Sequence, residues 1–269
     1  SIYSSPDFAL SMVRVLPAAA LGMLLLGLAL CLCLPVRPMT MQEAMHHGNL
    51  LVLYIWLYGC LAGALPFVLG GQLTFVQALF EAVSGWTTTG LSVMDVTVTP
   101  SIFLFYRSFM QFCGGLGFVM IMMTFVQGRM GMVLYSAEGH PDKLMPTLRE
   151  TVRTIVLMYM AFLAVGVGAY VLCGMPVFDA VLHTMGALST GGFSNRAESI
   201  GAYHSVAIEG VTVVLMLVGT TNFAILLLLV RRKWRDALRC SELRFLGVLL
   251  AVFVPVTALV LMTGLYMSL

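Results

Sequence analysis

Six long apolar runs dominate this sequence, at about 12–34, 49–69, 101–126, 152–173, 205–230 and 245–267. A membrane-spanning helix needs about 20 predominantly apolar residues, and each run is long enough. Hydrophobic residues make up 60% of the chain and charged residues only 10%, against about 25% charged in soluble domains. We therefore predict an all-α integral membrane protein with six transmembrane helices in a lipid bilayer.

The basic residues predict the side of the membrane on which each connection lies. Of the 14 Lys and Arg residues, one lies in 35–47, four in 127–153 and six in 231–244. Cytoplasmic connections carry such an excess, so these three should be cytoplasmic and the intervals between them external. The formal net charge of +2 is too small to indicate a nucleic-acid partner.

Two intervals between apolar runs, 71–100 and 174–204, share an unusual organisation. Each contains a short amphipathic segment, 74–86 or 177–188, which is too short to cross a membrane. A polar, Gly-containing turn follows each segment: turn 1 (87–90) and turn 2 (189–192). Irregular backbone at membrane depth is tolerated only where protein buries it or where it lines a water-filled path. We expect the segments to be re-entrant pore helices and the turns to be filter loops.

The order of span, re-entrant helix, turn and span therefore occurs twice, and the glycines at positions 90 and 192 lie 102 positions apart. One repeat cannot enclose a pore, so neighbouring repeats must complete it. The predicted divisions are an N-terminal helix with its connection (1–48), pore repeat 1 (49–126), a cytoplasmic connection (127–151), pore repeat 2 (152–230), and a basic connection with the first helix of a third repeat (231–269).

Backbone carbonyl oxygens in the two turns could replace the hydration shell of a monovalent cation. Gly tolerates the unusual φ angles that let adjacent carbonyls point the same way, and the negative ends of the preceding helices would favour cations. The alternative is that both are ordinary turns joining membrane helices. The candidate ion-binding residues are Thr87, Thr88, Thr89, Gly90, Ser189, Thr190, Gly191 and Gly192.

The run Phe80-Glu-Ala-Val-Ser-Gly-Trp-Thr-Thr-Thr-Gly90 resembles the first filter of the Trk/Ktr/HKT superfamily of potassium transporters. The segment 105–117 is similar to the helix that follows this filter, and Ser189-Thr-Gly-Gly-Phe-Ser194 is similar to the second filter. The likeness covers nearly the whole chain and is strongest to the bacterial TrkH-like branch.

This resemblance implies four span–loop–span repeats around one pseudo-fourfold pore, with an extracellular or periplasmic filter in the bacterial inner membrane. It also implies a homodimer, a cytoplasmic nucleotide-binding regulatory subunit, and potassium as the substrate, with no cofactor in this chain. In the plant branch, Ser in place of the first filter Gly accompanies sodium preference, so Gly90 implies potassium. Only two of four filters are present, and we expect repeats 3 and 4 in the rest of a longer chain or in a second polypeptide.

Four further polar residues are candidates for the pore mouth or for support of the turns. Asp95 follows turn 1 and could concentrate cations, or it could be a solvated loop residue. Glu81 could face the permeation path or hydrogen-bond nearby backbone. Arg107 lies in an apolar run and should pair with Glu81 or with turn carbonyls. Asn222 could line a cavity below the turns or join two helices.

The predicted function is potassium uptake through a carbonyl filter, with two of its four quadrants supplied by this chain. The alternatives are a non-conducting structural half of a split transporter and a sodium- or proton-coupled cation carrier. A carrier with discontinuous helices typically has inverted repeats, whereas the basic connections give both repeats here the same orientation. No enzyme signature such as H-E-x-x-H, G-x-S-x-G or a P-loop occurs, and the sequence indicates no transition-metal site.

Overall fold

A computed structural model describes residues 41–117 and 148–267, and within these ranges every regular element is a helix. The described residues up to Gly219 form one compact unit and those from Thr220 onward form a second. The helices are α2 (Met41–Leu69), α3 (Phe75–Trp86), α4 (Ser101–Gly115), α7 (Leu148–Leu172), α8 (Val177–Leu188), the 3-10 helix η2 (Ser199–Tyr203), α9 (Val206–Thr220), α10 (Phe223–Val230), α11 (Trp234–Arg239) and α12 (Ser241–Met267).

Three described helices are long and apolar enough to cross a membrane, over Val52–Leu69, Val152–Leu172 and Ser241–Thr263. They correspond to three of the six predicted runs. The run at 12–34 lies outside the described residues, and the run at 101–126 is described only as far as residue 117, where α4 has already ended. The all-helical character of the described chain is therefore confirmed, and three spans are seen in it.

The apolar run 205–230, predicted as one helix, is divided into α9 and α10. Thr221 and Asn222 lie between the two helices, and the Asn222 carbonyl accepts the first hydrogen bond of α10 from the Leu226 N–H at 3.0 Å. Thr and Asn side chains compete with helical hydrogen bonding and favour helix starts. The prediction of one continuous helix was wrong here because it rested on apolar content, whereas Thr221 and Asn222 interrupt the helix.

The short helices α3 and α8 form where the sequence predicted them. Proline precedes α4 and α8, where a missing N–H costs no helical hydrogen bond. At the start of α3, the Gln77 side chain accepts a hydrogen bond from the Thr74 N–H at 3.1 Å, as in a capping box. These contacts fix where α3 and α8 begin.

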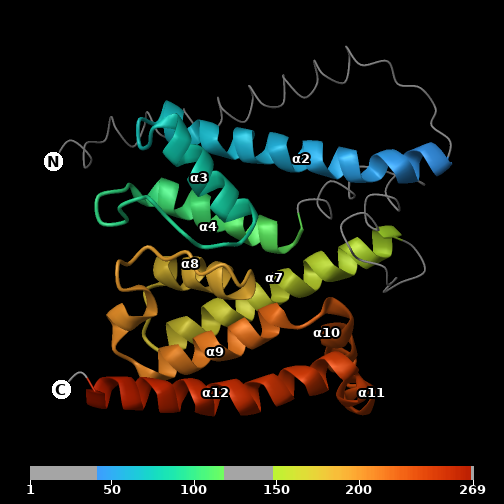
Figure 1. Ribbon diagram of the computed structural model, residues 1–269, viewed down its shortest axis with the longest axis vertical. Coiled ribbons are helices and arrows are strands. Elements are labelled where there is room, and N and C mark those ends of the chain that lie inside the picture. The colour runs from blue at the N-terminus through green and yellow to red at the C-terminus, as the bar shows by residue number, and fades with distance from the viewer. Residues whose placement is uncertain (1–40, 118–147, 268–269) are drawn as a thin grey trace. The chain divides into compact units, whose positions relative to one another are not determined.

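In the first unit, α3 packs against α2 and α4, and α8 packs against α7 and α4 (Figure 1). Phe67 of α2 meets Phe103 and Tyr106 of α4, with ring centroids 5.9 and 5.3 Å apart. Leu182 of α8 joins the same buried cluster. α4 is thus packed between α3 and α8. This packing brings the two turns together.

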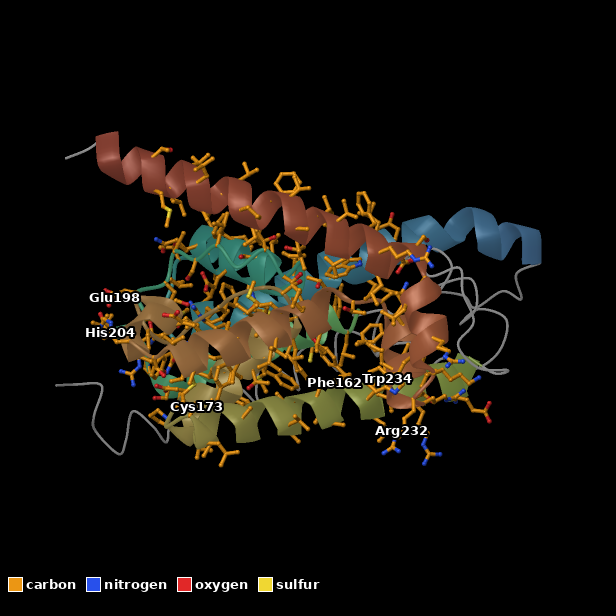
Figure 2. The ribbon with its side chains drawn as sticks, turned by 90° about the horizontal axis from the view of Figure 1, so that it is seen from below. Phe162, Cys173, Glu198, His204, Arg232 and Trp234 are labelled. Carbon is orange, nitrogen blue, oxygen red and sulfur yellow. The ribbon has the colours of Figure 1, made fainter. Side chains whose placement is uncertain are left out.

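The second unit contains α10, α11 and the long apolar helix α12. A tight turn joins α10 to α11, and Arg232 holds a positive φ of 59° within it. The side chains of Arg231, Arg232, Lys233 and Arg235 are exposed, and Figure 2 shows Arg232 and Trp234 projecting from this turn. The basic connection predicted at 231–244 is therefore a short helical link with an exposed cationic surface.

Candidate functional site

Turn 1 follows α3 and is closed by backbone hydrogen bonds. The Thr88 N–H donates to the Gly85 carbonyl at 3.0 Å. The Thr89 N–H donates to the Ser84 carbonyl at 2.9 Å. This pair of bonds is the Schellman arrangement that satisfies the last carbonyls of a helix.

Turn 2 ends α8 in the same way. The Thr190 N–H donates to the Ala187 carbonyl at 3.2 Å. The Gly191 N–H donates to the Gly186 carbonyl at 3.0 Å. Each of these residues lies 102 positions after its counterpart in turn 1. The internal repeat therefore extends to individual backbone hydrogen bonds.

The backbone angles of the two turns match as well. Thr88 and Thr190 have φ angles of 53° and 55°, and Gly90 and Gly192 have φ angles of 80° and 81°. Gly adopts such angles easily, whereas a β-branched residue in this region is an outlier that costs on the order of 1–3 kcal/mol. Strain of this kind concentrates at functional sites, and here it occurs at equivalent positions in both copies.

The two turns contact each other through backbone. A Cβ added at Gly90 would overlap the carbonyl oxygen of Gly191, so only Gly fits at this contact. A Cβ added at Gly191 would overlap the side chain of Gln111, which is fully buried. The Gln111 Oε1 in turn accepts a hydrogen bond from the Phe193 N–H at 3.0 Å. Turn 1, turn 2 and α4 therefore meet at one point.

Hydroxyl groups hold turn 1 from the side of α3. The Thr87 hydroxyl donates to the Val83 carbonyl at 2.7 Å and lies 2.8 Å from the Thr89 hydroxyl. The Ser84 hydroxyl donates to the Leu91 carbonyl at 2.6 Å. These contacts fix the backbone on both sides of Gly90 without using a charged group.

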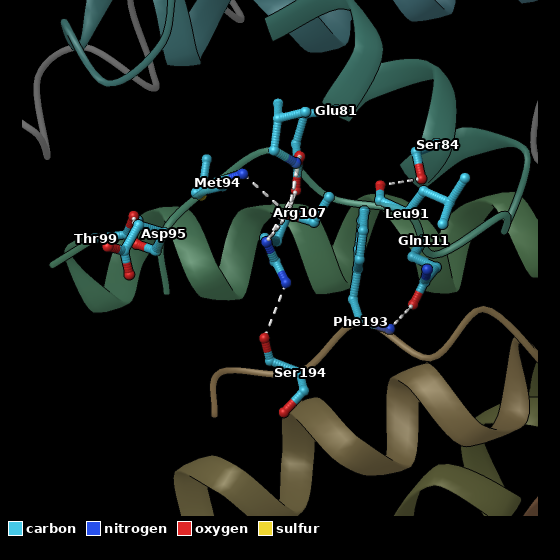
Figure 3. A network of polar contacts seen from close by, with 12 residues as sticks. Glu81, Ser84, Leu91, Met94, Asp95, Thr99, Arg107, Gln111, Phe193 and Ser194 are labelled. Carbon is cyan, nitrogen blue, oxygen red and sulfur yellow. Dashed lines mark hydrogen bonds and ion pairs between the residues drawn. The ribbon is translucent and has the colours of Figure 1, made fainter. Parts of the chain in front are cut away.

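Arg107 connects α4 to both repeats (Figure 3). Its guanidinium pairs with Glu81 at 2.9 Å, donates to the Ser92 hydroxyl at 2.9 Å, and donates to the Ser194 carbonyl at 2.9 Å. It also lies 4.3 Å from the ring centroid of Phe193. Glu81 and Arg107 are both buried. The sequence predicted a partner in Glu81 or in turn carbonyls, and the structure shows Glu81 together with a carbonyl just after turn 2.

Repeat 2 contains a neutral version of the same contact. The Ser92 hydroxyl donates to Glu81, 11 positions earlier. At the equivalent positions, the Ser194 hydroxyl lies 3.0 Å from the Nε2 of His183, also 11 positions earlier. The other ring nitrogen of His183 lies 2.8 Å from the Asp179 carbonyl. Both ring nitrogens of the buried His183 therefore have hydrogen-bond partners.

A second ion pair organises the loop after turn 2. Asp179, in the first turn of α8, pairs with Arg196 at 2.8 Å and accepts hydrogen bonds from Asn195 and Tyr203. Burial and the hydrogen bond to Asp179 raise the pKa of Tyr203 to about 12, so its hydroxyl stays protonated and donates. This cluster joins the start of α8 to η2.

Asp95 lies in the loop after turn 1 and is exposed. The side chain and backbone N–H of Thr97 donate to its carboxylate at 2.6 and 2.9 Å, and these bonds hold the pKa of Asp95 below its usual value. Asp95 lines an open pocket of about 340 Å³ together with Gly90, Gly192 and Arg107. An ionised carboxylate and the glycines of both turns therefore share one pocket.

Asn222 belongs to the second unit, where it starts α10. Its predicted place in a cavity below the turns stays a prediction. The residues that the sequence reasoning missed are Gln111, Ser92 and Asp179. A signal for Ser92 was present, since an 11-residue spacing from a polar helix position to Ser occurs in both repeats. Nothing local marks Gln111, because its bond to Phe193 spans 82 positions.

The ends of α3 and α8 carry the negative poles of their helix dipoles, and the turns that follow contain no charged residue. Such an arrangement can attract a cation and bind it weakly enough for release. The buried guanidinium of Arg107 is already committed to Glu81 and to loop oxygens. The site therefore brings two helix C-termini and two uncharged backbone turns together.

A family model and several known proteins are similar to this chain. The family model described as "TrkH: Cation transport protein" matches residues 22–266. The Trk system potassium uptake protein TrkG of Escherichia coli K12 is 35% identical over 236 residues, which cover 84% of this chain and 49% of that protein. The Trk system potassium uptake protein TrkH of Salmonella typhimurium is 32% identical over 238 residues, covering 83% and 48%.

A solved structure is similar as well. The crystal structure of the potassium transporter TrkH from Vibrio parahaemolyticus superposes with a TM-score of 0.61 and 28% identity, covering 81% of this chain and 48% of that one. The chain spans about half the length of these relatives. The residues matched by the family model make up most of the sequence, and the chain therefore belongs to the TrkH family of cation transport proteins.

Proposed function

We propose that this chain supplies two of the four quadrants of a potassium-selective filter, through which potassium enters the cell. In this proposal α3 and α8 are re-entrant pore helices, and the carbonyl oxygens of turns 1 and 2 are the ion ligands. The observation that carries the proposal is the repetition of one strained turn, with the same hydrogen bonds and the same left-handed Thr and Gly, at a backbone-to-backbone contact. The relatives named as potassium uptake proteins support potassium as the cation.

The incompleteness of the filter is supported by the way in which the two repeats contact each other. α4 of repeat 1 packs on α8 of repeat 2, which is a head-to-tail contact that continues around a ring. Residues of α4 that are buried have exposed counterparts 102 positions later on α9: Leu104 is 6% exposed and Val206 84%, while Gln111 is 0% and Val213 55%. A third repeat placed on α9 would bury these residues.

Gly90 and Gly192 differ in the same way, because only Gly90 has a neighbouring turn against it. A side chain at Gly90 would strike turn 2, whereas among the described residues nothing lies within 4 Å of a Cβ added at Gly192. In a closed ring, the next repeat would place a carbonyl beside Gly192 as turn 2 does beside Gly90. This asymmetry supports a partner that carries repeats 3 and 4, on the same chain or on another.

The membrane arrangement is proposed from charge. Six spans with basic connections on the cytoplasmic side put both turns on the periplasmic side of a bacterial inner membrane. The exposed basic link between α10 and α11 would then face the cytoplasm, where it could meet anionic lipid or the nucleotide-binding regulatory subunit that we also propose. A homodimer of complete transporters is part of the same proposal.

The proposal is tested by Gly90→Ser in the complete transporter. A side chain at Gly90 would displace the Gly191 carbonyl, so the ratio of potassium to sodium permeability should fall by about tenfold, equivalent to roughly 1.4 kcal/mol of discrimination. The matched control is Gly71→Ser. Gly71 also has a positive φ, of 63°, but a Cβ there meets no described atom within 4 Å.

Reversal potentials measured in mixed potassium and sodium solutions give this ratio independently of the amount of folded protein. An unchanged ratio in Gly90→Ser, or an equal fall in Gly71→Ser, would contradict the filter assignment. A non-conducting structural half is the second candidate, because two turns alone do not enclose an ion path. Residues 1–269 expressed alone in cells without potassium uptake separate the two, because rescue of growth at low potassium would exclude a purely structural role.

A further inference from the structure

Gln111 lies at the point where turn 1, turn 2 and α4 meet. The side chain is fully buried. A Cβ added at Gly191 would overlap its amide group, and a Cβ added at Gly90 would lie 3.9 Å from its Nε2. Gln111 is therefore the one described side chain that closely approaches the facing glycines of both turns.

The orientation of the amide follows from its one hydrogen bond. The Phe193 N–H can only donate, so the group that faces it at 3.0 Å must be the oxygen Oε1 (Figure 3). Nε2 therefore points away from Phe193. No described residue accepts a hydrogen bond from this buried nitrogen.

An unpaired buried donor costs roughly 1–3 kcal/mol, and folded proteins leave few of them. The backbone of turns 1 and 2 lies beside this nitrogen, which a Cβ added at Gly191 would overlap and which lies 3.9 Å from a Cβ added at Gly90. Because Gly90 abuts the Gly191 carbonyl, a small shift of either turn would bring a carbonyl oxygen into reach of Nε2. The amide oxygen would then hold turn 2, and the amide nitrogen would donate a hydrogen bond at the contact between turn 1 and turn 2.

We propose that Gln111 is a positioning residue that sets the spacing between turns 1 and 2 and thereby the ion selectivity of the filter. Its Oε1 anchors turn 2 at Phe193, and its Nε2 donates to a backbone carbonyl at the Gly90–Gly191 contact when the turns close around a dehydrated cation. This inference rests on the proposed function. The position 102 residues later is Val213, so the device belongs to the junction between turns 1 and 2 and has no counterpart on α9.

The test uses two variants of similar size in the complete transporter. Gln111→Glu keeps an acceptor for Phe193 and removes the donor, and Gln111→Met removes both. The control is Ser108→Ala, which removes another buried polar group without a described partner, three residues earlier on α4. Reversal potentials give the potassium-to-sodium ratio, and rubidium uptake gives the maximal rate.

Both Gln111 variants should lower the potassium-to-sodium ratio by about three- to tenfold, more than they lower the maximal rate, while Ser108→Ala leaves the ratio unchanged. An unchanged ratio in both Gln111 variants, with Gly90→Ser still lowering it, would overturn the role of Gln111 and leave the filter assignment standing. An unchanged ratio in all of them, Gly90→Ser included, would reject the filter itself. Loss of folded protein in both variants would make Gln111 a residue of the fold and overturn the proposal.

Discussion

Threonine in a left-handed backbone conformation is costly, and this molecule keeps one at the same place in each of two turns. The hydrogen bonds that enforce the conformation come from the ends of α3 and α8, and around turn 1 from Thr87 and Ser84 as well. The strain is thus held largely by the helices that precede the turns. Such support gives a backbone site the fixed geometry that selection between similar cations requires.

The buried Glu81–Arg107 pair is the charged part of this support. Removing one partner leaves the other charge buried, so Glu81→Gln or Arg107→Gln should each lower the free energy of unfolding by roughly 3–5 kcal/mol. The double variant should lose less than the sum of the two. Thermal unfolding in detergent across the full cycle measures this coupling.

The control for that cycle is Arg196→Gln. Arg196 is half-exposed, and Asp179 keeps Asn195 and Tyr203 as partners when Arg196 is removed. We expect a loss of at most about 1 kcal/mol, as for solvent-exposed ion pairs. Additive losses in the Glu81–Arg107 cycle would show that the two side chains act independently.

We expect Asp95 to attract cations before they reach the turns. Because the Thr97 hydrogen bonds lower its pKa, the carboxylate is ionised above the usual Asp pKa and loses its charge only when the pH falls through its lower folded value. Asp95→Asn should therefore raise the KM for potassium by about two- to threefold at low ionic strength, and less at about 0.15 M salt. In the wild type, the contribution of Asp95 to KM should be constant from about pH 5 to 8. An unchanged KM for potassium in Asp95→Asn at low salt would contradict a role for Asp95 at the pore mouth.

Among the elements that position the site, the sequence predicted the two short helices. The bounds of the two short helices followed from polar turns set against apolar runs, and the Arg107–Glu81 pair followed from the cost of a lone charge in an apolar segment. The break between α9 and α10 did not, because Thr221 and Asn222 lie inside an otherwise continuous apolar run. Gln111 and Asp179 were missed because their partners are brought near by tertiary packing of α4 on α8 and of α8 on η2.

The exposed face of α9 is the predicted contact surface for a third repeat. Gly210 is the counterpart of Ser108, which is 1% exposed on α4, yet a Cβ added at Gly210 meets no described atom within 4 Å. If a third repeat packs on α9, Gly210→Leu should overpack that contact by roughly 1–3 kcal/mol and lower potassium uptake. Gly168→Leu, at an equally open position on α7, should leave uptake unchanged. Equal uptake in both variants would place the docking face elsewhere.

For the whole molecule, we propose that two strained turns from successive repeats form adjoining walls of one ion path. The packing of α4 between α3 and α8 makes this possible, since it carries both Gln111 and Arg107 to the junction. Sequence alone could propose the two turns as equivalent, but it could not show that they touch. That contact depends on packing between residues about 100 positions apart.

The most direct measurement is anomalous scattering from rubidium bound to the complete transporter. We expect a rubidium peak that is bounded by backbone carbonyl oxygens of both turn 1 and turn 2, and that is lost or displaced in Gly90→Ser. Rubidium peaks elsewhere along the ion path, with none at either turn, would contradict it.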